Sequence, residues 1–315
     1  MDVLTFGESM VAFSTINDES IVRTSQASVS VAGAESNVAT ALARLNHKVK
    51  WVSRVGEDVF GQKILHTLRA EGIDTEGVTR DPANQTGLMF KQKRSLLNTE
   101  VLYYREKSAA SALSAEDIDP AWIEQCKIIH ITGITPSLSD SCKKLVTEVV
   151  RLGKKYNKLI SFDPNVRLKL WNIEEARETL LPIIKESDIF LPGKDELKML
   201  LGLETLQDIE KFALEWKIPA MVVKDGAKGA WLIEDGHTEF VKSFEINNVI
   251  DEVGAGDAFA AGFLHGYLNG KTRVESIVYG HALAAFAIST EGDTGGLPTQ
   301  KELQSFLKED SETIR

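Results

Sequence analysis

The fold is decided by residues 127–163, "KIIHITGITPSLSDSCKKLVTEVVRLGKKYNKLISFD", which predict a strand, a helix and a second strand. The runs "KIIHIT" (127–132) and "KLISFD" (158–163) are short and apolar, and the amphipathic stretch over about 140–156 lies between them. Two strands joined through a helix run parallel, and the crossover between them is right-handed. We therefore expect an α/β protein with a mostly parallel central sheet flanked by helices.

The same alternation extends in both directions along the chain. Further strands are expected at 2–7, 48–56, 188–192 and 220–225, and a hairpin at 230–244 that turns at Asp235-Gly236. Further helices are expected at 33–46, 58–72, 174–186, 195–201, 206–216, 256–270, 273–289 and 300–308.

Two β-rich segments interrupt this alternation. Residues 21–32 look extended, and the runs 86–94 and 99–106 flank "SLLN" as a hairpin would. Because these runs have no partner helices, they fit poorly into a wound sheet. We expect a small β-sheet lid, inserted at about 10–32 and 86–106 into a single domain that spans 1–315, covering one end of it.

Composition excludes several classes of protein. The chain has 315 residues, of which 43% are apolar, a net charge of −10 and a pI near 5.2, which argues against a nucleic-acid or acidic-membrane surface. Cys126 and Cys142 form no metal or disulfide motif, so reduced thiols in a cytoplasmic protein are expected. The first residues do not resemble a signal peptide, and no apolar run approaches the roughly 20 residues needed to span a bilayer.

The stretch "DEVGAGDAFAAGF" (251–263) carries the candidate chemistry. Gly254 and Gly256 allow a tight turn whose amides point outward, and the helix that follows adds its positive end, so the turn suits phosphate oxygens. Asp257 on this turn can receive a proton from an attacking alcohol, and the helix end is expected to keep it ionised. Alone, Asp257 could equally be an ordinary helix cap.

In combination, two stretches resemble the signatures of ribokinase-like (PfkB) carbohydrate kinases. "DEVGAGDAFAAGF" is similar to D-T-x-G-A-G-D-x-F-x-x-G with Glu252 in place of threonine, and residues 28–62 are similar to the N-terminal signature with Ala32 in place of its first glycine. The resemblance spans nearly the whole chain. It implies a ribokinase-like fold with a lid, ATP and Mg²⁺ as cofactors, Asp257 as catalytic base, and an anion hole made by Gly254, Ala255 and Gly256.

The resemblance also assigns nucleotide and metal residues. "VVKDGAKGAWLI" (222–233) is similar to the family's nucleotide loop, and "SDIFLPGKDEL" (187–197) takes the place of its N-x-x-E segment, with glycine where asparagine is usual. Glu196 is thereby assigned to magnesium, and a need for a monovalent cation stays open. The cofactor-binding residues implied are Asn165, Gly193, Lys224, Gly226, Lys228, Gly229, Gly254 and Gly256.

Two arginine-bearing stretches indicate the substrate. "YYREKSAASAL" (103–113) places an arginine at the end of the lid hairpin, and "SFDPNVRLKLW" (161–171) places another after the carboxyl end of a sheet strand. A guanidinium matches the planar carboxylate of a sugar acid. Both stretches resemble the 2-keto-3-deoxygluconate kinase branch of the family. The substrate residues implied are Gly33, Asn37, Met89 (where a tyrosine is common), Tyr103, Arg105, Arg167, Asp257 and Asp293.

The resulting hypothesis is ATP-dependent phosphorylation of a sugar acid, most specifically 2-keto-3-deoxygluconate at its 6-hydroxyl. A kinase for a neutral sugar (fructokinase or ribokinase type) and a non-catalytic sugar-binding protein of the same fold stay open, as does the gluco or galacto epimer. A dinucleotide-dependent oxidoreductase is disfavoured because no GxGxxG follows the first strand. Apolar Leu88, Phe90 and Val101 on the lid suggest a homo-oligomer formed through the lid.

Overall fold

A nine-stranded sheet forms the centre of the protein. The computed structural model describes residues 1–16, 19–94 and 97–313, and the side chains among them except those of 93–94, 97–98 and 309–313. The strand order is β13-β12-β11-β10-β9-β8-β1-β4-β5. Neighbours are parallel from β5 to β11, and the β11–β12 and β12–β13 pairs are antiparallel. The strands are β1 (Val3–Phe6), β4 (Val49–Gly56), β5 (Val78–Asp81), β8 (Ile128–Thr132), β9 (Leu159–Asp163), β10 (Ile189–Phe190), β11 (Met221–Lys224), β12 (Gly229–Glu234) and β13 (His237–Lys242).

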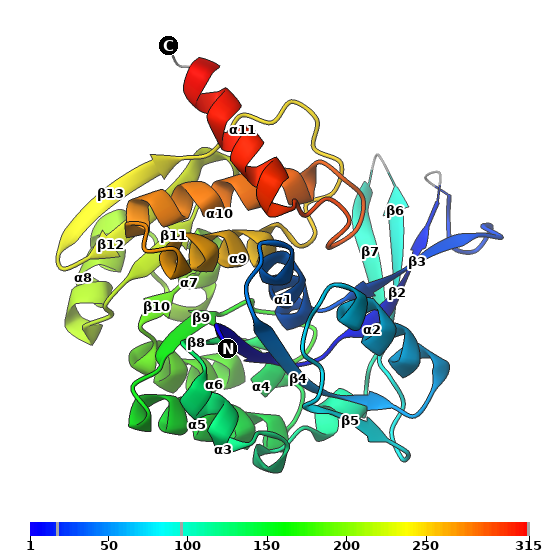
Figure 1. Ribbon diagram of the computed structural model, residues 1–315. Coiled ribbons are helices and arrows are strands. Elements are labelled where there is room, and N and C mark those ends of the chain that lie inside the picture. Colours follow the sequence, from blue (N-terminus) through cyan, green and yellow to red (C-terminus); the bar gives the residue numbers. More distant parts are fainter. Residues whose placement is uncertain (17–18, 95–96, 314–315) are drawn as a thin grey trace.

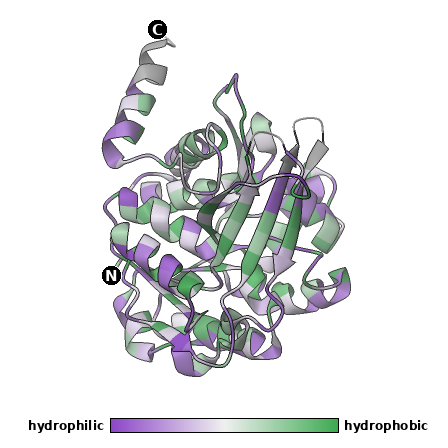
Figure 2. Ribbon diagram, turned by 90° about the vertical axis from the view of Figure 1, so that its right-hand side faces the viewer, coloured by the Kyte–Doolittle hydropathy of each residue, from purple (hydrophilic) through white to green (hydrophobic). Residues whose placement is uncertain are grey.

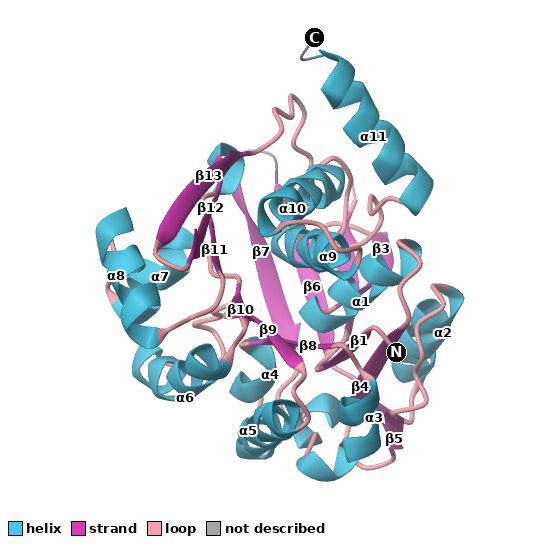
Figure 3. Cartoon of the chain, turned by 60° about the vertical axis from the view of Figure 1, so that its left-hand side comes forward, coloured by secondary structure: helices cyan, strands magenta, loops and turns pink. Residues whose placement is uncertain are grey.

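Helices cover both faces of this sheet, because alternate strand residues point to opposite sides. On β11, Val222 joins one apolar core while Met221 and Val223 join the other. The first core is shared with α1 (Ala34–Arg44), α2 (Val59–Ala70), α9 (Ala255–Leu268), α10 (Arg273–Ile288) and α11 (Gln300–Thr313). The second is shared with α3 (Pro120–Gln125), α5 (Asp140–Lys155), α6 (Ile173–Glu186), α7 (Lys194–Leu201) and α8 (Leu206–Trp216). Figure 3 shows the two helical layers with the sheet between them.

A second sheet of four strands stands beside the main body, on the right of Figure 1. Its order is β3-β2-β6-β7, from β2 (Met10–Thr15), β3 (Ala27–Ala32), β6 (Leu88–Arg94) and β7 (Leu97–Tyr104). We call this sheet the lid. Only the second half of the segment 21–32 is a strand, because residues 21–26 form turns. Residues 95–96 of the expected hairpin turn lie outside the described residues.

The other strands and helices expected from the sequence are present, with ends that differ by a few residues. The hairpin turn at Asp235-Gly236 is confirmed, and both residues have the positive φ (49° and 75°) that such a turn requires. The sequence placed β2 within the lid segment 10–32 without marking it as a separate strand, and it did not indicate β5, α3 or the short α4 (Ile134–Ser137). These elements are short, and tertiary contacts rather than local pattern stabilise them.

The expectation of reduced thiols is confirmed: Cys126 and Cys142 are both buried and free. Burial raises the pKa of each thiol to about 11. Over the described residues, no helix combines the length and apolar character that crossing a membrane requires.

Candidate active site

The glycine turn before α9 places Asp257 at the carboxyl ends of the sheet strands. Gly254 caps the helix with φ +82°, and a Cβ there would lie 2.8 Å from the carbonyl oxygen of Asp293. Asp251 holds the approach to the turn by accepting a hydrogen bond from the Val253 amide at 3.1 Å. The positive φ of residue 254 and the nearby Asp293 carbonyl both exclude a side chain, so this turn requires a glycine at position 254.

Two asparagines hold the Asp257 carboxylate. Asn37 of α1 donates from Nδ2 to Oδ2 at 2.8 Å, and Asn165, in the loop after β9, donates from Nδ2 to Oδ1 at 3.3 Å. Asn165 has φ +35°, a conformation that asparagine tolerates better than most residues. The sequence assigned Asn165 to the nucleotide, whereas its side chain here contacts Asp257.

Burial raises the pKa of Asp257 to about 7, and the nearby charges of Asp163 and Asp293 add to this effect. The hydrogen bond from Asn37 and the charge of Arg167 act in the opposite direction. The expectation that this carboxyl is kept ionised is therefore not met at neutral pH, because desolvation raises its pKa to about 7. A carboxyl that titrates near neutrality can both accept and return a proton.

Asp293 lies beside Asp257 and connects the site to the lid. Its Oδ2 is 3.3 Å from the same Asn37 nitrogen, and its Oδ1 forms an ion pair with Lys91 of β6. The sequence interpretation did not include Lys91. A period of two from Met89 places residue 91 on the same face of the lid strand, so this signal could have identified it.

Arg105 follows β7 and forms a buried ion pair with Glu8. Ser108 donates to the other oxygen of Glu8 at 2.5 Å, and the Arg105 guanidinium lies 5.5 Å from the Tyr103 ring. The Arg105 side chain is only 9% exposed, yet its Nε has no hydrogen-bond partner among the described residues. The sequence interpretation did not include Glu8, because its role depends on a residue nearly one hundred positions away.

Gly33, Met89 and Arg167 are the remaining predicted sugar residues. A Cβ at Gly33 would lie 2.4 Å from the carbonyl oxygen of Glu8, so the two backbones are in close contact. Met89 pairs across the lid with Tyr103 and is buried in a small apolar cluster. Arg167 is exposed, and its charge reaches Asp257.

On the other side of Asp257, charged residues meet at the ends of β9 and β11. Lys224 Nζ contacts Asp163 Oδ2 at 2.7 Å and lies 3.8 Å from where a Cβ on Gly256 would be. Burial lowers the pKa of Lys224, but Asp163 and Glu196 raise it more, so the ammonium is retained. This places a fixed positive charge beside the glycine turn.

Glu196 lies in the first turn of α7, and its carboxylate faces backbone amides. Its two oxygens accept hydrogen bonds from Val166 at 2.8 Å and from Gly193 at 2.7 Å. Burial and the neighbouring Asp163 raise the pKa of Glu196, while Lys224 opposes the shift. Gly193 pairs with Lys224 as an isolated bridge, so the two predicted nucleotide segments do meet.

The turn between β11 and β12 carries the other predicted nucleotide residues, Gly226, Lys228 and Gly229. Lys228 is exposed and its Nζ lies 3.4 Å from Asp225, and Gly226 has φ +55° with open space around it. A Cβ at Gly229 would lie 2.2 Å from the carbonyl oxygen of Val241, so pairing of β12 with β13 requires a glycine there.

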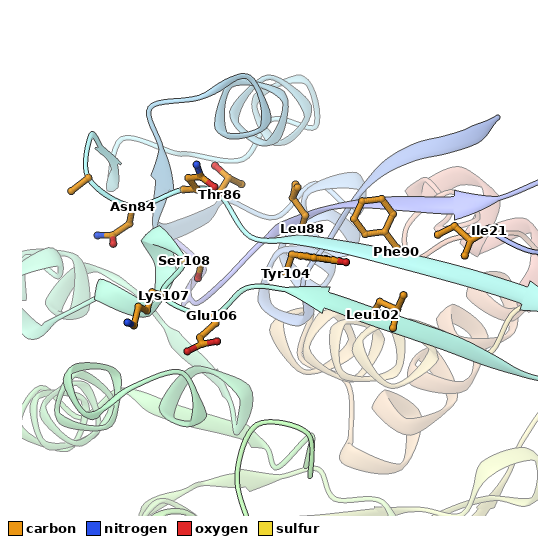
Figure 4. A pocket seen from close by; sticks show the side chains of 12 residues that line it. Ile21, Asn84, Thr86, Leu88, Phe90, Leu102, Tyr104, Glu106, Lys107 and Ser108 are labelled. Carbon is orange, nitrogen blue, oxygen red and sulfur yellow. The ribbon is translucent and has the colours of Figure 1, made fainter. Parts of the chain in front are cut away.

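A hollow of about 810 Å³ lies on the outer face of the lid, opposite the face that carries Met89 and Lys91, and Figure 4 shows the residues that line it. Leu88, Phe90, Leu102 and Tyr104 of β6 and β7 contribute its apolar wall. Val101, expected on this surface, faces the inner cluster with Met89 instead. None of the predicted site residues lines this hollow.

Known proteins resemble this chain over almost its whole length. The pattern of the pfkB family carbohydrate kinases matches residues 1–300. A 2-dehydro-3-deoxygluconokinase of Bacillus subtilis (strain 168) is 37% identical over 309 residues, which are 98% of this chain and 95% of that protein. The crystal structure of a PfkB protein from Polaromonas sp. JS666 is 34% identical with a TM-score of 0.88, covering 96% of this chain and 99% of that one.

A putative Ribokinase II from E. coli, crystallised in complex with ATP and Mg²⁺, is 25% identical with a TM-score of 0.90 and covers 98% of this chain and 99% of that one. The expected ribokinase-like fold with a small lid sheet is confirmed by this similarity and by the strand order.

Proposed function

This chain belongs to the pfkB family of carbohydrate kinases, and we propose that it phosphorylates a sugar acid, specifically 2-keto-3-deoxygluconate at its 6-hydroxyl. The buried Arg105 carries this proposal, because its Nε is a donor without a partner among the described residues. A buried unsatisfied donor costs about 1–3 kcal/mol, which a substrate carboxylate would recover. Tyr103 and Arg167 complete the proposed carboxylate site, and the related 2-dehydro-3-deoxygluconokinase supports the substrate class.

In this proposal Asp257 is the general base. Asn37 and Asn165 hold its two oxygens, which fixes the direction in which the carboxylate faces the sugar. The proton of the sugar hydroxyl would pass to Asp257 as the hydroxyl oxygen bonds to the γ-phosphorus and ADP leaves. A base with a pKa of about 7 is matched to this transfer at neutral pH. Gly33, Asn37, Met89 and Asp293 border the proposed sugar site.

ATP and Mg²⁺ are the proposed cofactors, and the charges present fit them. The amides of Gly254, Ala255 and Gly256 and the Lys224 ammonium offer donors to phosphate oxygens. Asp163 and Glu196 are neighbouring carboxylates whose repulsion a divalent cation would relieve. When bound, magnesium supplies positive charge against the phosphates. Further proposed nucleotide contacts are Asn165, Gly193, Gly226, Lys228 and Gly229.

A panel of substrates tests the proposal. The wild-type protein, ATP and Mg²⁺ are assayed for ADP release with gluco- and galacto-configured 2-keto-3-deoxy sugar acids, fructose and ribose. We expect a sugar acid to give the highest kcat/KM. If none of the sugars causes release of ADP, a non-catalytic sugar-binding protein of the same fold is favoured.

A kinase for a neutral sugar is the second candidate, because Glu8 already neutralises Arg105. The variant Arg105→Met separates the two. For a sugar acid it should raise KM at least tenfold, the effect of losing one charge-assisted hydrogen bond of about 1.5–3 kcal/mol. Arg273→Met, which removes a half-buried arginine from its pair with Glu234, is the control. Fructose or ribose as the better substrate, with an unchanged KM in Arg105→Met, would establish the neutral-sugar activity.

We also propose that a second copy of this chain covers the outer face of the lid. Leu102 and Tyr104 are exposed there next to Leu88 and Phe90, and Figure 2 looks onto this side, where hydrophobic stretches run along the strands. Light scattering after gel filtration should give a dimer for wild type and a monomer for Leu102→Glu. A monomeric wild type would refute this pairing.

A further inference from the structure

Lys91 is a buried lysine that β6 of the lid directs toward the main body. In the lid register it lies opposite Val101 and two residues after Met89, on the inner face. Its side chain is 7% exposed, and its ion-pair partner Asp293, in the loop before α11, is 6% exposed. Because a buried lysine and a buried aspartate are each costly alone, their pairing fixes both groups.

A chain of contacts runs from Lys91 to the proposed base. Asp293 accepts from Lys91 through one oxygen and lies 3.3 Å from Asn37 Nδ2 through the other. The same Asn37 nitrogen donates to Asp257 at 2.8 Å, so the two carboxylates are close neighbours. The backbone of Asp293 also packs against Gly254 of the anion turn.

Lys91 changes the balance of charge around Asp257. The carboxylates of Asp163 and Asp293 favour the protonated form of Asp257, and Arg167 favours the ionised form. Lys224, which is paired with Asp163, also interacts with Asp257 through its charge. Lys91 is the cation that neutralises Asp293, and it is supplied by the lid rather than by the main body.

We propose that Lys91 is a positioning residue that, from the lid, neutralises Asp293 and so favours the ionised form of Asp257 while Asn37 holds it. This inference rests on the proposed function and extends it. Since the ammonium reaches Asp293 from a lid strand, moving the lid away would break the pair and favour protonated Asp257, which cannot accept the sugar proton. Proton transfer from the sugar is thereby linked to coverage of the site by the lid.

The pH profile of kcat tests the proposal in three variants. Lys91→Met should move the acid limb upward by about one pH unit, because an uncompensated Asp293 makes the pair of carboxyls bind a proton more tightly. Lys91→Arg keeps the charge and should restore the wild-type limb. Lys169→Met is the control, because Lys169 also ties the main body to the lid, through the Val101 carbonyl at 3.0 Å, but without a carboxylate partner in that contact.

An acid limb in Lys91→Met that coincides with wild type, or one that Lys91→Arg shifts as far, would overturn the proposal. Titration of ¹³C-aspartate carboxyl signals in the unliganded protein gives an answer that does not need activity. The signal that disappears from the spectrum of Asp257→Asn belongs to the Asp257 carboxyl. In Lys91→Met this signal should titrate about one pH unit higher than in wild type. If the substrate panel fails but this signal shifts, the proposed function is wrong while the coupling stands. If the panel succeeds and the signal does not move, the coupling alone is wrong.

Discussion

Replacing Asp257 with asparagine should remove most of the activity and at the same time stabilise the protein. The pKa of this carboxyl is raised from 3.8 to about 7, chiefly by burial. A shift of that size means that ionising Asp257 in the folded protein costs about 4 kcal/mol more than in the unfolded chain. Asparagine is neutral and nearly isosteric, so the variant avoids this cost.

The pH dependence gives the prediction its sign. Between pH 3.8 and about 7 the folded protein binds the Asp257 proton more tightly than the unfolded chain does, so the free energy of unfolding of the wild type falls as pH rises through this window. The variant lacks this dependence. Asn37 and Asn165 both donate to Asp257, and an asparagine amide satisfies only one of them, which costs about 1–2 kcal/mol. We therefore expect Asp257→Asn to be about 2–3 kcal/mol more stable at pH 8.

Urea unfolding at pH 8 and pH 5, followed by tryptophan fluorescence, measures this difference. The advantage of the variant should shrink toward pH 5, while its turnover falls by about 10²–10⁴-fold. Asp235→Asn makes the same change in the exposed β12–β13 turn and should alter neither quantity. An equal stability gap at both pH values, or a variant less stable at pH 8, would refute the argument that burial sets this pKa.

Three further outcomes are expected. For wild type, kcat/KM should fall below a pH of about 7, because protonated Asp257 cannot accept the sugar proton; a flat profile from pH 5 to 8 would contradict the base role. Gly254→Ala should lower the free energy of unfolding by about 1–3 kcal/mol and reduce turnover, since φ is +82° and the Asp293 carbonyl blocks a Cβ; calorimetry showing an unchanged Tm would be inconsistent with this turn. Glu196→Gln should raise the Mg²⁺ concentration that gives half-maximal rate by about tenfold, because one buried negative charge is lost; an unchanged magnesium titration would remove Glu196 from the metal site.

Most of the fold could be predicted because its signals are local. The apolar strands at 127–132 and 158–163 and the helix between them are visible in any short window of sequence. The strands that were missed had weak signals: β5 has only four residues and lies at the sheet edge, and β2 belongs to the lid, whose order depends on pairing with β3 and β6. Strand pairing joins segments as far apart in the sequence as Val3 of β1 and Ile128 of β8, which no local pattern encodes.

The residues of the candidate site were predictable where a local motif marks them and were missed where their role depends on a distant partner. Motif resemblance identified Asp257, Asn37 and Asp293, which the structure brings together. It did not identify Glu8 or Lys91, because each acts through a partner on a distant segment. The glycine loop at 226–229 was assigned to the nucleotide, but Gly229 has a sufficient structural reason in the β12–β13 pairing.

The sequence by itself determined the α/β alternation and the glycine turn, because hydrophobic periodicity and a positive φ are properties of a few consecutive residues. Only the tertiary structure decided the proton affinity of Asp257, the buried pairing of Arg105 with Glu8 and the contact of Lys91 with Asp293. Desolvation and charge–charge energies depend on distances in space, and here they are set by groups from α1, the lid and the loops after β9 and α10.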